Sequence, residues 1–212
     1  MRVISGQAKG RRLFSVPGQA TRPITDRVKT SLFNILGDRV QDARFLDLFA
    51  GTGSVGIEAL SRGARQAVFV ELSERALSTI HRNLEVTQLA ERAQVARRDV
   101  FKFIASYAGE PFDIIYVAPP QYQGLWARTL HALDGSPFAP RPAGLLASDG
   151  LVVAQMHPKE YEPLELTTLM LSDQRTYGST MLCFYKIRQI PTVEGKPSST
   201  DSAHGPGSSA LR

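Results

Sequence analysis

Short apolar runs alternate with helical segments between residues 44 and 118, and this alternation limits the possible folds more than any other feature of the chain. The apolar runs cover residues 44–50, 66–72, 93–99 and 112–118. The residues between them place apolar side chains at helical spacing. Strands that alternate with helices in this way are joined by right-handed crossovers, so they form a parallel sheet that helices cover on both faces.

The chain departs from this rhythm after a fifth apolar run at residues 151–156. Two more strand patterns follow at residues 166–178 and 179–187, and they meet at Gly178. Strands this close in sequence pair as an antiparallel hairpin. The sequence therefore predicts an α/β fold with a seven-stranded, mostly parallel sheet and an antiparallel C-terminal hairpin. This arrangement resembles the Rossmann-like sheet of class I methyltransferases.

An N-terminal extension precedes the sheet. Residues 2–7 and 11–16 have strand patterns and residues 25–36 have a helical one, so we expect a small β-hairpin followed by a helix. We divide the chain into this extension (1–40), a methyltransferase-like domain (41–188) and a tail (189–212). The tail is rich in Pro, Gly and Ser, and we expect it to be disordered.

The extension is strongly basic. Residues 1–30 carry seven lysines and arginines and one acid, a net of +6, whereas the whole chain has a net charge of +5. Such a segment is suited to contact nucleic-acid phosphates. A solvated terminus that keeps the protein soluble would have the same charge. The residues expected to contact RNA are Arg2, Lys9, Arg11 and Arg12.

The composition bears on where the protein works in the cell and on whether it binds a metal. No apolar run reaches the roughly 18–20 residues of a membrane-spanning helix, and the N-terminus has no apolar core of a secretory signal. The one cysteine, Cys183, lies in a buried-strand pattern and has no partner for an internal disulfide, which fits a reducing cytoplasm. Four scattered histidines and this cysteine form no ligand cluster, so we expect no metal.

The glycines after the first predicted strand indicate a nucleotide site. Gly51, Gly53 and Gly56 fit G-x-G-x-x-G, and Glu71 ends the second strand twenty residues after Gly51. Glycines let the backbone turn sharply and approach a ligand, and an acid at that position accepts hydrogen bonds from ribose hydroxyls. This pattern alone fits NAD as well as S-adenosylmethionine.

Three features favour S-adenosylmethionine. Asp47 lies at the tip of the first strand, where a carboxylate suits the cationic aminoacyl part of that cofactor and would repel a pyrophosphate. Asp99 ends the third strand, where it could accept a hydrogen bond from the adenine amino group. The sequence leaves no second domain for a hydride donor or acceptor. The structural alternative for Asp47 is a carboxylate that caps the turn.

Longer stretches resemble a known family. These are RVISGQAKGRRL, TRPITDRVKTSLFNIL, FLDLFAGTGSVGIEALSRGA, VFVEL and the double proline that ends the fourth strand. They are similar to the bacterial 16S ribosomal RNA guanine-N2 methyltransferases, which modify guanine 966 of the small subunit. The resemblance covers about residues 1–187, and RPITDRVK is its most specific part because we find no generic structural reason for it. It implies S-adenosylmethionine as the cofactor and 16S rRNA, in the small subunit or its assembly intermediate, as the partner. We expect the protein to be a monomer.

The resemblance also implies a set of cofactor-binding residues. In this set, Gly51 and Gly53 would cradle the cofactor and Glu71 would bind the ribose. Asp99 and Val100 would bind the adenine. Arg22, Pro23 and Thr25 would lie beside the methionine end. The whole set is Arg22, Pro23, Thr25, Asp47, Phe49, Gly51, Gly53, Glu71, Leu72, Asp99 and Val100.

The fourth strand ends differently from the family pattern. The family has Asp or Asn before two prolines and Phe or Tyr directly after them, whereas here Ala118 precedes Pro119 and Pro120, and Gln121 precedes Tyr122. In the usual site, the acidic or amide side chain and a backbone carbonyl accept hydrogen bonds from the base amino group. Loss of one charged acceptor costs ~1.5–3 kcal/mol, or about tenfold to a hundredfold in rate.

Such a loss slows an enzyme without abolishing its activity, so we expect an active variant. Gln121 offers a replacement amide oxygen, although it is also a common surface turn residue. Tyr122 is the candidate for stacking on a base that has left its helix.

Features of the sequence fit four candidate functions to different extents. The leading interpretation is methylation of guanine N2 in 16S rRNA. An rRNA-binding assembly factor without catalysis rests on Ala118 alone. A DNA amino-methyltransferase would share the double proline, but it would need a target-recognition domain. An NAD oxidoreductase rests only on the glycine pattern.

Overall fold

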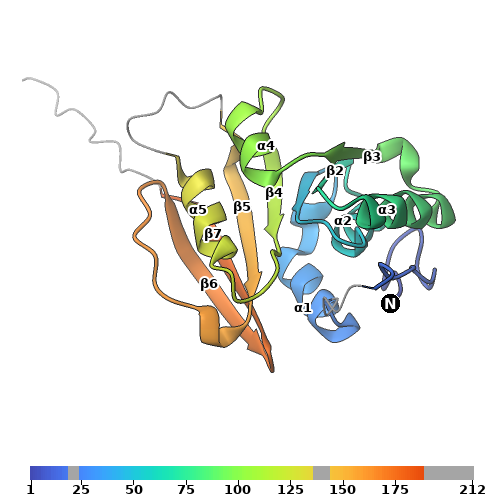
Figure 1. The fold of residues 1–212 in the computed structure, drawn as a ribbon, viewed down its shortest axis with the longest axis horizontal. Coiled ribbons are helices and arrows are strands. Elements are labelled where there is room, and N and C mark those ends of the chain that lie inside the picture. The colour runs from blue at the N-terminus through green and yellow to red at the C-terminus, as the bar shows by residue number, and fades with distance from the viewer. Residues whose placement is uncertain (19–23, 136–143, 189–212) are drawn as a thin grey trace, which may run out of the picture.

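The predicted alternation of strands and helices is present in the computed structural model, which describes residues 1–18, 24–135 and 144–188 (Figure 1). The helices are α1 (Asp26–Leu36), α2 (Ser54–Ser61), α3 (Glu74–Thr87), α4 (Val100–Ser106) and α5 (Leu125–Asp134). Short 3-10 turns cover Gly37–Val40, Ala90–Arg92 and Pro158–Glu160. The strands are β1 (Arg44–Leu48), β2 (Gln66–Glu71), β3 (Ala93–Arg97), β4 (Phe112–Val117), β5 (Leu146–Met156), β6 (Leu169–Tyr177) and β7 (Thr180–Ile187). The predicted tail lies outside the described residues.

The seven strands form one sheet in the order β3-β2-β1-β4-β5-β7-β6. Strands β1 to β5 are parallel, and β7 is antiparallel to both β5 and β6. This confirms the predicted parallel sheet with an antiparallel C-terminal hairpin. The strand order changes direction at β1, which has β2 on one side and β4 on the other. Open α/β sheets bind ligands at the carboxyl ends of the strands beside such a point.

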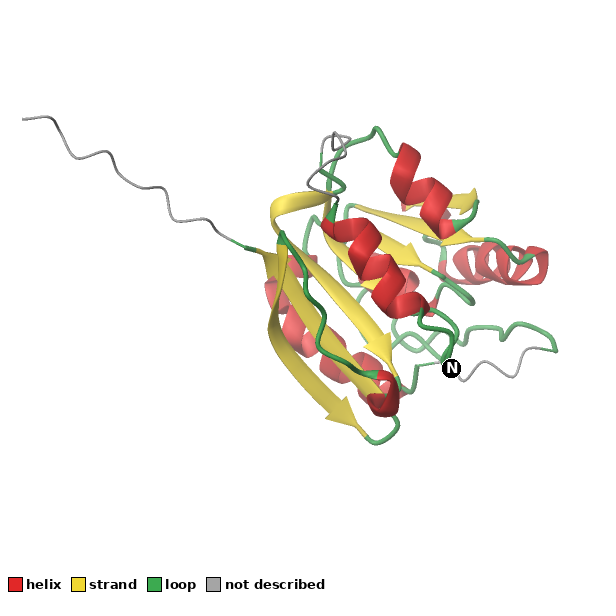
Figure 2. Cartoon of the chain, turned by 60° about the vertical axis from the view of Figure 1, so that its left-hand side comes forward, coloured by secondary structure: helices red, strands yellow, loops and turns green. Residues whose placement is uncertain are grey.

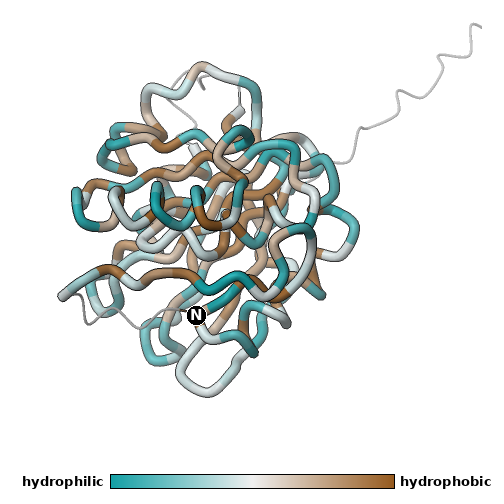
Figure 3. Tube along the Cα trace, turned by 90° about the vertical axis from the view of Figure 1, so that its right-hand side faces the viewer, coloured by the Kyte–Doolittle hydropathy of each residue, from teal (hydrophilic) through white to brown (hydrophobic). Residues whose placement is uncertain are grey.

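Apolar side chains form a buried layer on each face of the sheet. One layer joins α1, α2 and α3 to the strands, and the other joins α4 and α5 to them. Strand β1 contributes to both, with Phe45 in the first layer and Leu46 and Leu48 in the second. Figure 2 shows helices on both sides of the strands, and in Figure 3 the hydrophobic trace is concentrated in the interior. The central strands are therefore buried on both faces, as their apolar runs predict.

Some element boundaries differ from those predicted. Strand β3 ends at Arg97, and Asp99 belongs to the start of α4, where its side chain caps the helix. Strand β5 begins at Leu146 rather than at residue 151, because its first part pairs with β4 across an irregularity in the register. Helix α5 was not predicted, although its buried Trp126 and Leu130 stand at helical spacing.

The N-terminal extension contains less strand than predicted. Its two segments run antiparallel, but they form only one isolated bridge, between Arg2 and Arg12. The first segment bonds to α2 instead: the N–H groups of Ile4 and Ser5 donate to the carboxylate of Glu58, at 2.8 and 3.0 Å. A strand ladder cannot extend where its donors are already satisfied elsewhere. The extension is thus packed against the sheet domain, and its apolar residues join the layer of α1, α2 and α3.

A buried ion cluster joins residues 1–18 of the extension to its helix α1 and to α2. Lys29 of α1 and Glu58 of α2 are fully buried, and their charged groups lie 3.3 Å apart. Lys29 also donates to the carbonyl of Arg2, at 2.7 Å, and Arg62 donates to Glu58 at 2.8 Å. Burial lowers the pKa of Lys29, and the Glu58 carboxylate opposes that shift. We call Lys29, Glu58 and Arg62 the Glu58 cluster.

The Glu58 cluster gives part of RPITDRVK a structural reason that the sequence did not reveal. Thr25 caps α1, because its hydroxyl oxygen accepts a hydrogen bond from the N–H of Val28. Asp26 forms an exposed ion pair with Arg2, at 3.2 Å. Lys29 is the buried cation described above. These residues of the motif therefore cap α1 and hold Arg2 against it.

Replacing Gly6 with alanine should destabilise the protein more than replacing Gly10. Both residues have left-handed φ angles, +81° and +84°, so alanine is strained at both by about 1–2 kcal/mol. A Cβ at Gly6 would lie 1.8 Å from the carbonyl oxygen of Ser61, whereas nothing lies within 4 Å at Gly10. We expect Gly6→Ala to cost a further ~1–3 kcal/mol in urea unfolding. Equal losses would show that the extension does not rest on α2 in solution.

Candidate active site at the carboxyl ends of the strands

The turn that joins β1 to α2 has an unusual backbone. Phe49, Gly51 and Gly53 all have left-handed φ angles, of 60°, 55° and 73°. Gly53 is the N-cap of α2, so the first free N–H groups of the helix follow this turn directly. At Gly56 the requirement is space, because a Cβ there would lie 2.4 Å from the ring of Phe69. The glycine pattern therefore provides the sharp turn that the sequence predicts, and Gly56 also allows close packing of the helix on the sheet, which the sequence did not predict.

Glu71 braces this turn from the end of β2. One carboxylate oxygen accepts from the N–H of Gly51 at 2.8 Å, and the other accepts from the N–H groups of Leu72 and Ser73 at 2.8 and 2.9 Å. The side chain thus ties the turn after β1 to the turn after β2. Leu72 is 60% exposed, an unusual position for a leucine. The predicted contacts of Glu71 with a ribose and of Leu72 with the cofactor stay predictions.

Asp47 lies beneath the turn rather than at its surface. The residue is only 2% exposed, and one of its carboxylate oxygens accepts from the N–H of Gly56 at 3.0 Å. Burial raises the pKa of Asp47 to about 8, against the effect of that hydrogen bond, and the charge of Glu71 raises it further. This is the capping interaction named above as the structural alternative. A contact with the aminoacyl part of the cofactor stays a prediction.

The other described cofactor residues that were predicted lie at the starts of helices α4 and α1. Asp99 accepts a hydrogen bond from the N–H of Lys102 at 3.0 Å, and Val100 is buried. Thr25 lies at the start of α1, on the side of the sheet where Ile24 packs against the buried layer. Their contacts with adenine and with the methionine end stay predictions. Arg22 and Pro23 lie outside the described residues.

The end of β4 leads into an exposed loop that contains the double proline. Ala118 bonds through its N–H to the carbonyl of Leu48, at 3.4 Å, which places it beside the end of β1. Pro119 is half-buried, whereas Pro120 and Gln121 are exposed. Ala118 also packs against the layer of α1, α2 and α3. The double proline and the glycine turn therefore lie at the ends of adjacent strands.

Tyr122 is held in this loop by residues that follow β5. It has a left-handed φ of 60°, and its side chain leaves the residue 66% exposed. Its N–H donates to Glu160 at 2.6 Å, and its ring centroid lies 5.5 Å from that of His157. Sequence analysis missed Glu160 and His157. The available signal was their position directly after β5, because the carboxyl ends of parallel strands share one edge of the sheet.

A second contact between β4 and β5 was also missed. The hydroxyl of Tyr116 in β4 donates to the side-chain oxygen of Gln155 in β5, at 2.6 Å. Tyr116 is paired in register with Asp47 of β1. Burial, together with the nearby charge of Asp47, raises the pKa of Tyr116 well above its usual value. A row of polar side chains thus crosses three strands below the ends of β1 and β4.

The residues predicted to contact RNA lie on the extension. Lys9, Arg11 and Arg12 are exposed, and Arg2 is exposed although it pairs with Asp26. The backbone beside them bonds to the end of α2, because the N–H groups of Gln7 and Ala8 donate to Ser61 at 2.7 and 2.9 Å. They therefore form a positioned basic surface rather than a free arm. Contact with RNA stays a prediction.

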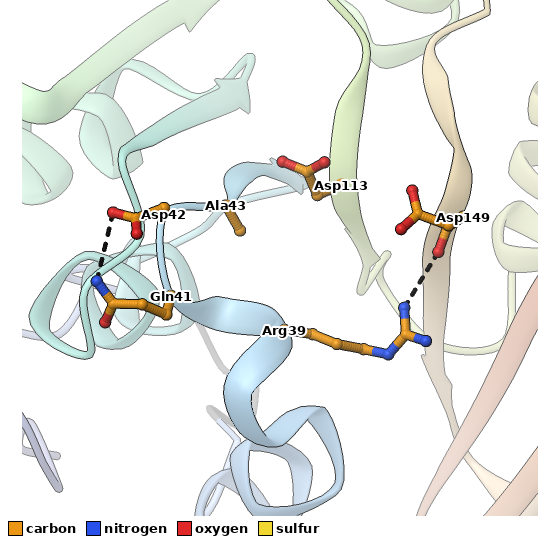
Figure 4. A pocket seen from close by; sticks show the side chains of 6 residues that line it. All are labelled: Arg39, Gln41, Asp42, Ala43, Asp113 and Asp149. Atoms are coloured by element: carbon orange, nitrogen blue, oxygen red, sulfur yellow. Dashed lines mark hydrogen bonds between the residues drawn. The ribbon is translucent and has the colours of Figure 1, made fainter.

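A cavity of about 200 Å³ lies at the opposite edge of the sheet (Figure 4). It is lined by Arg39, Gln41, Asp42, Ala43, Asp113 and Asp149. Ala43 precedes β1 and Asp113 lies near the start of β4, so this cavity is remote from the glycine turn. Within residues 1–18, 24–135 and 144–188, no group of three or more His, Cys, Asp or Glu could hold a metal ion. Nor is any described helix long and apolar enough to cross a membrane.

Comparisons with known proteins show the family and the fold of this chain. Residues 1–186 match the protein family described as Conserved hypothetical protein 95. The chain is 32% identical over 186 residues to Ribosomal RNA small subunit methyltransferase D of Escherichia coli (strain K12), a match that covers 88% of this chain and 89% of that protein. It is 39% identical over 191 residues to YlbH of Bacillus subtilis (strain 168), whose description as an rRNA methyltransferase is provisional, with 89% of this chain and all of that protein covered. The solved structure of the Escherichia coli protein yhhF matches with a TM-score of 0.75 and 32% identity, over 88% of this chain and 97% of that one.

Proposed function

The chain belongs to the family described as Conserved hypothetical protein 95, that of ribosomal RNA small subunit methyltransferase D, and we propose that it methylates the exocyclic N2 of guanine 966 in 16S rRNA. The family consists of S-adenosylmethionine-dependent rRNA methyltransferases with the class I fold. This membership decides between S-adenosylmethionine and NAD, which the glycine pattern alone left open. Action on ribosomal RNA would take place in the cytoplasm, and we propose a monomer as the active form.

One observation carries the proposal. The glycine turn after β1, braced by Glu71, lies next to the double-proline loop after β4, at the point where the strand order changes direction. Gly51 has only the carbonyl of Phe49 within 4 Å of where a Cβ would stand, so a ligand can approach the backbone there. The turn, the exposed Leu72 and the Glu71 carboxylate suit a nucleoside with a short charged chain.

The roles of the residues follow from this arrangement. S-adenosylmethionine supplies an activated methyl group, and the glycine turn, Glu71 and Leu72 would hold its nucleoside part. The double-proline loop would bring the target amino group to the same edge of the sheet, with Tyr122 stacked on the extruded base. Much of the rate enhancement would come from positioning the two reactants. The alternative that Ala118 favours is a cofactor-binding assembly factor without catalysis.

Transfer of a labelled methyl group tests the proposal. Purified protein is incubated with labelled S-adenosylmethionine and with 16S rRNA, immature small subunits or mature small subunits. The proposal predicts N2-methylguanosine in at least one of the three substrates. Tight binding of the cofactor with no methylation of any substrate would favour the assembly factor.

Replacing Arg11 and Arg12 with alanine should weaken RNA binding without regard to sequence. Neutralised phosphates release counterions, so the slope of log K against log salt should fall by about 0.7–0.9 for each lost phosphate contact. Affinity for S-adenosylmethionine should stay the same, because neither arginine is among the predicted cofactor-binding residues. The matched control replaces two exposed arginines elsewhere, Arg65 and Arg175, and should leave the slope unchanged. A slope that does not change in the first variant would show that the basic surface serves only solubility.

A further inference from the structure

Ala118 and Gln155 occupy neighbouring positions on one face of the sheet. Strands β4 and β5 are parallel, and their last paired residues are Val117 and Ala154, which Ala118 and Gln155 follow directly. Side chains alternate along strands, so both lie on the face opposite Val117 and Ala154. Two contacts agree with this: Ala118 packs against the layer of α1, α2 and α3, and Gln155 bonds to Tyr116, which lies in that layer.

Tyr116 fixes the orientation of the Gln155 side-chain amide. Tyr116 is only 2% exposed, and its hydroxyl donates to the amide oxygen at 2.6 Å. An amide oxygen has two lone pairs, so one remains available after this bond. Gln155 itself is half-buried, next to the carboxyl edge of the sheet. By contrast, Gln121 is exposed in the loop beyond the prolines, and no described residue bonds to its side chain.

We propose that Gln155 accepts a hydrogen bond from the target amino group and thereby replaces the side chain that is missing at Ala118. The inference rests on the proposed function, since it names the residue that contacts the guanine in that reaction. The neighbouring strand supplies the acceptor at nearly the place where an acid before the prolines would have supplied it. Tyr116 is the positioning residue, because it holds the amide without reaching the substrate.

The chemistry requires an acceptor rather than a base. When the amide oxygen binds one N–H of the guanine amino group, the lone pair on that nitrogen points toward the methyl carbon. The nitrogen–carbon bond forms while the carbon–sulfur bond breaks, and the electron pair of the broken bond stays on sulfur. The nitrogen then loses a proton to water, because a neutral amide does not take it up.

Single-turnover methylation of 16S rRNA or small subunits tests the inference with four variants. Gln155→Ala should lower the rate about tenfold to a hundredfold, with unchanged affinity for S-adenosylmethionine. Gln155→Glu keeps an acceptor oxygen and should retain most of the rate. Adding Ala118→Asp to Gln155→Ala should restore it. Gln121→Ala tests the competing acceptor in the loop, and it should react faster than Gln155→Ala.

A second readout does not depend on turnover. Small subunits are reconstituted with 16S rRNA that carries either guanine or inosine at the target position, because inosine lacks the N2 amino group. Wild-type protein with S-adenosylhomocysteine should bind the guanine form more tightly. Gln155→Ala and Tyr116→Phe should both reduce this preference, whereas Gln121→Ala should keep it.

The outcomes distinguish a failure of the role of Gln155 from a failure of the proposed methyltransferase function. If wild-type protein methylates but Gln155→Ala is equally fast and keeps the preference for guanine, the role of Gln155 is wrong. If Gln121→Ala is the slow variant, the acceptor lies in the loop instead. If wild-type protein methylates none of the substrates, the proposed function fails, and the preference for guanine over inosine alone decides whether Gln155 contacts the amino group.

Discussion

Glu58→Ala should lower the free energy of unfolding by about 3–5 kcal/mol, because it leaves the buried Lys29 without its counter-charge. The substitution also removes the acceptor of the N–H groups of Ile4 and Ser5 and the partner of Arg62. These groups tie the extension to α2. We therefore expect the extension to detach at a lower urea concentration than the rest of the protein, with loss of hydrogen-exchange protection at Ile4 and Ser5.

A double substitution tests whether the unpaired charge of Lys29 causes this loss of stability. Lys29→Met combined with Glu58→Leu removes both charges and keeps the volume, so it should be much more stable than Glu58→Ala. Arg62→Ala removes the more exposed partner and should cost about 1 kcal/mol or less. The account of the Glu58 cluster is wrong if Glu58→Ala unfolds at the same urea concentration as the wild type.

Asp47→Asn should stabilise the protein without cofactor at alkaline pH and change little at acid pH. Burial raises the pKa of Asp47 to about 8 in the folded protein, whereas the unfolded chain has the ordinary value of about 3.9. Between these values the unfolded state gives up its proton and the folded state keeps it. The folded protein therefore loses about 1.4 kcal/mol of stability for each unit by which pH rises through this window. Asparagine does not titrate, and its oxygen can still accept from Gly56.

Urea unfolding at pH 5 and pH 8.5 measures this difference. The wild type should lose stability between the two values by on the order of several kcal/mol relative to Asp47→Asn. Asp134 does not add to this difference: burial raises its pKa, but hydrogen bonds from Thr167, Leu169 and Thr168 lower it by more. Its contribution to stability is present above the unfolded pKa and is lost as pH falls. Parallel pH dependences of wild type and Asp47→Asn would contradict the raised pKa.

The parts of the fold that could be predicted are those with a local signal. The central strands are apolar on both faces, so their runs stand out in the sequence, and the hairpin of β6 and β7 is marked by Gly178. The glycine turn was also recognised, because its pattern and Glu71 have a fixed spacing. In each case the sequence near the element contains the physical reason for its structure.

The parts that could not be predicted depend on partners far away in the sequence. The extension forms a single bridge rather than two strands, because its N–H groups bond to Glu58 more than fifty residues later. Asp47 looks like a surface carboxylate until the structure shows that it is buried and bonded to the N–H of Gly56. Gln155 becomes a candidate only when β5 is placed beside β4.

Methyl transfer by the wild-type protein tests the central claim most directly. The protein is mixed in excess with immature small subunits and labelled S-adenosylmethionine, and the rRNA is then digested to nucleosides and mapped. The account predicts N2-methylguanosine at guanine 966, formed in a single turnover, and a rate about tenfold to a hundredfold lower in Gln155→Ala. A wild-type protein that binds S-adenosylmethionine tightly but transfers no methyl group to immature subunits, mature subunits or free 16S rRNA would contradict it, and Ala118 would then mark a site that only binds.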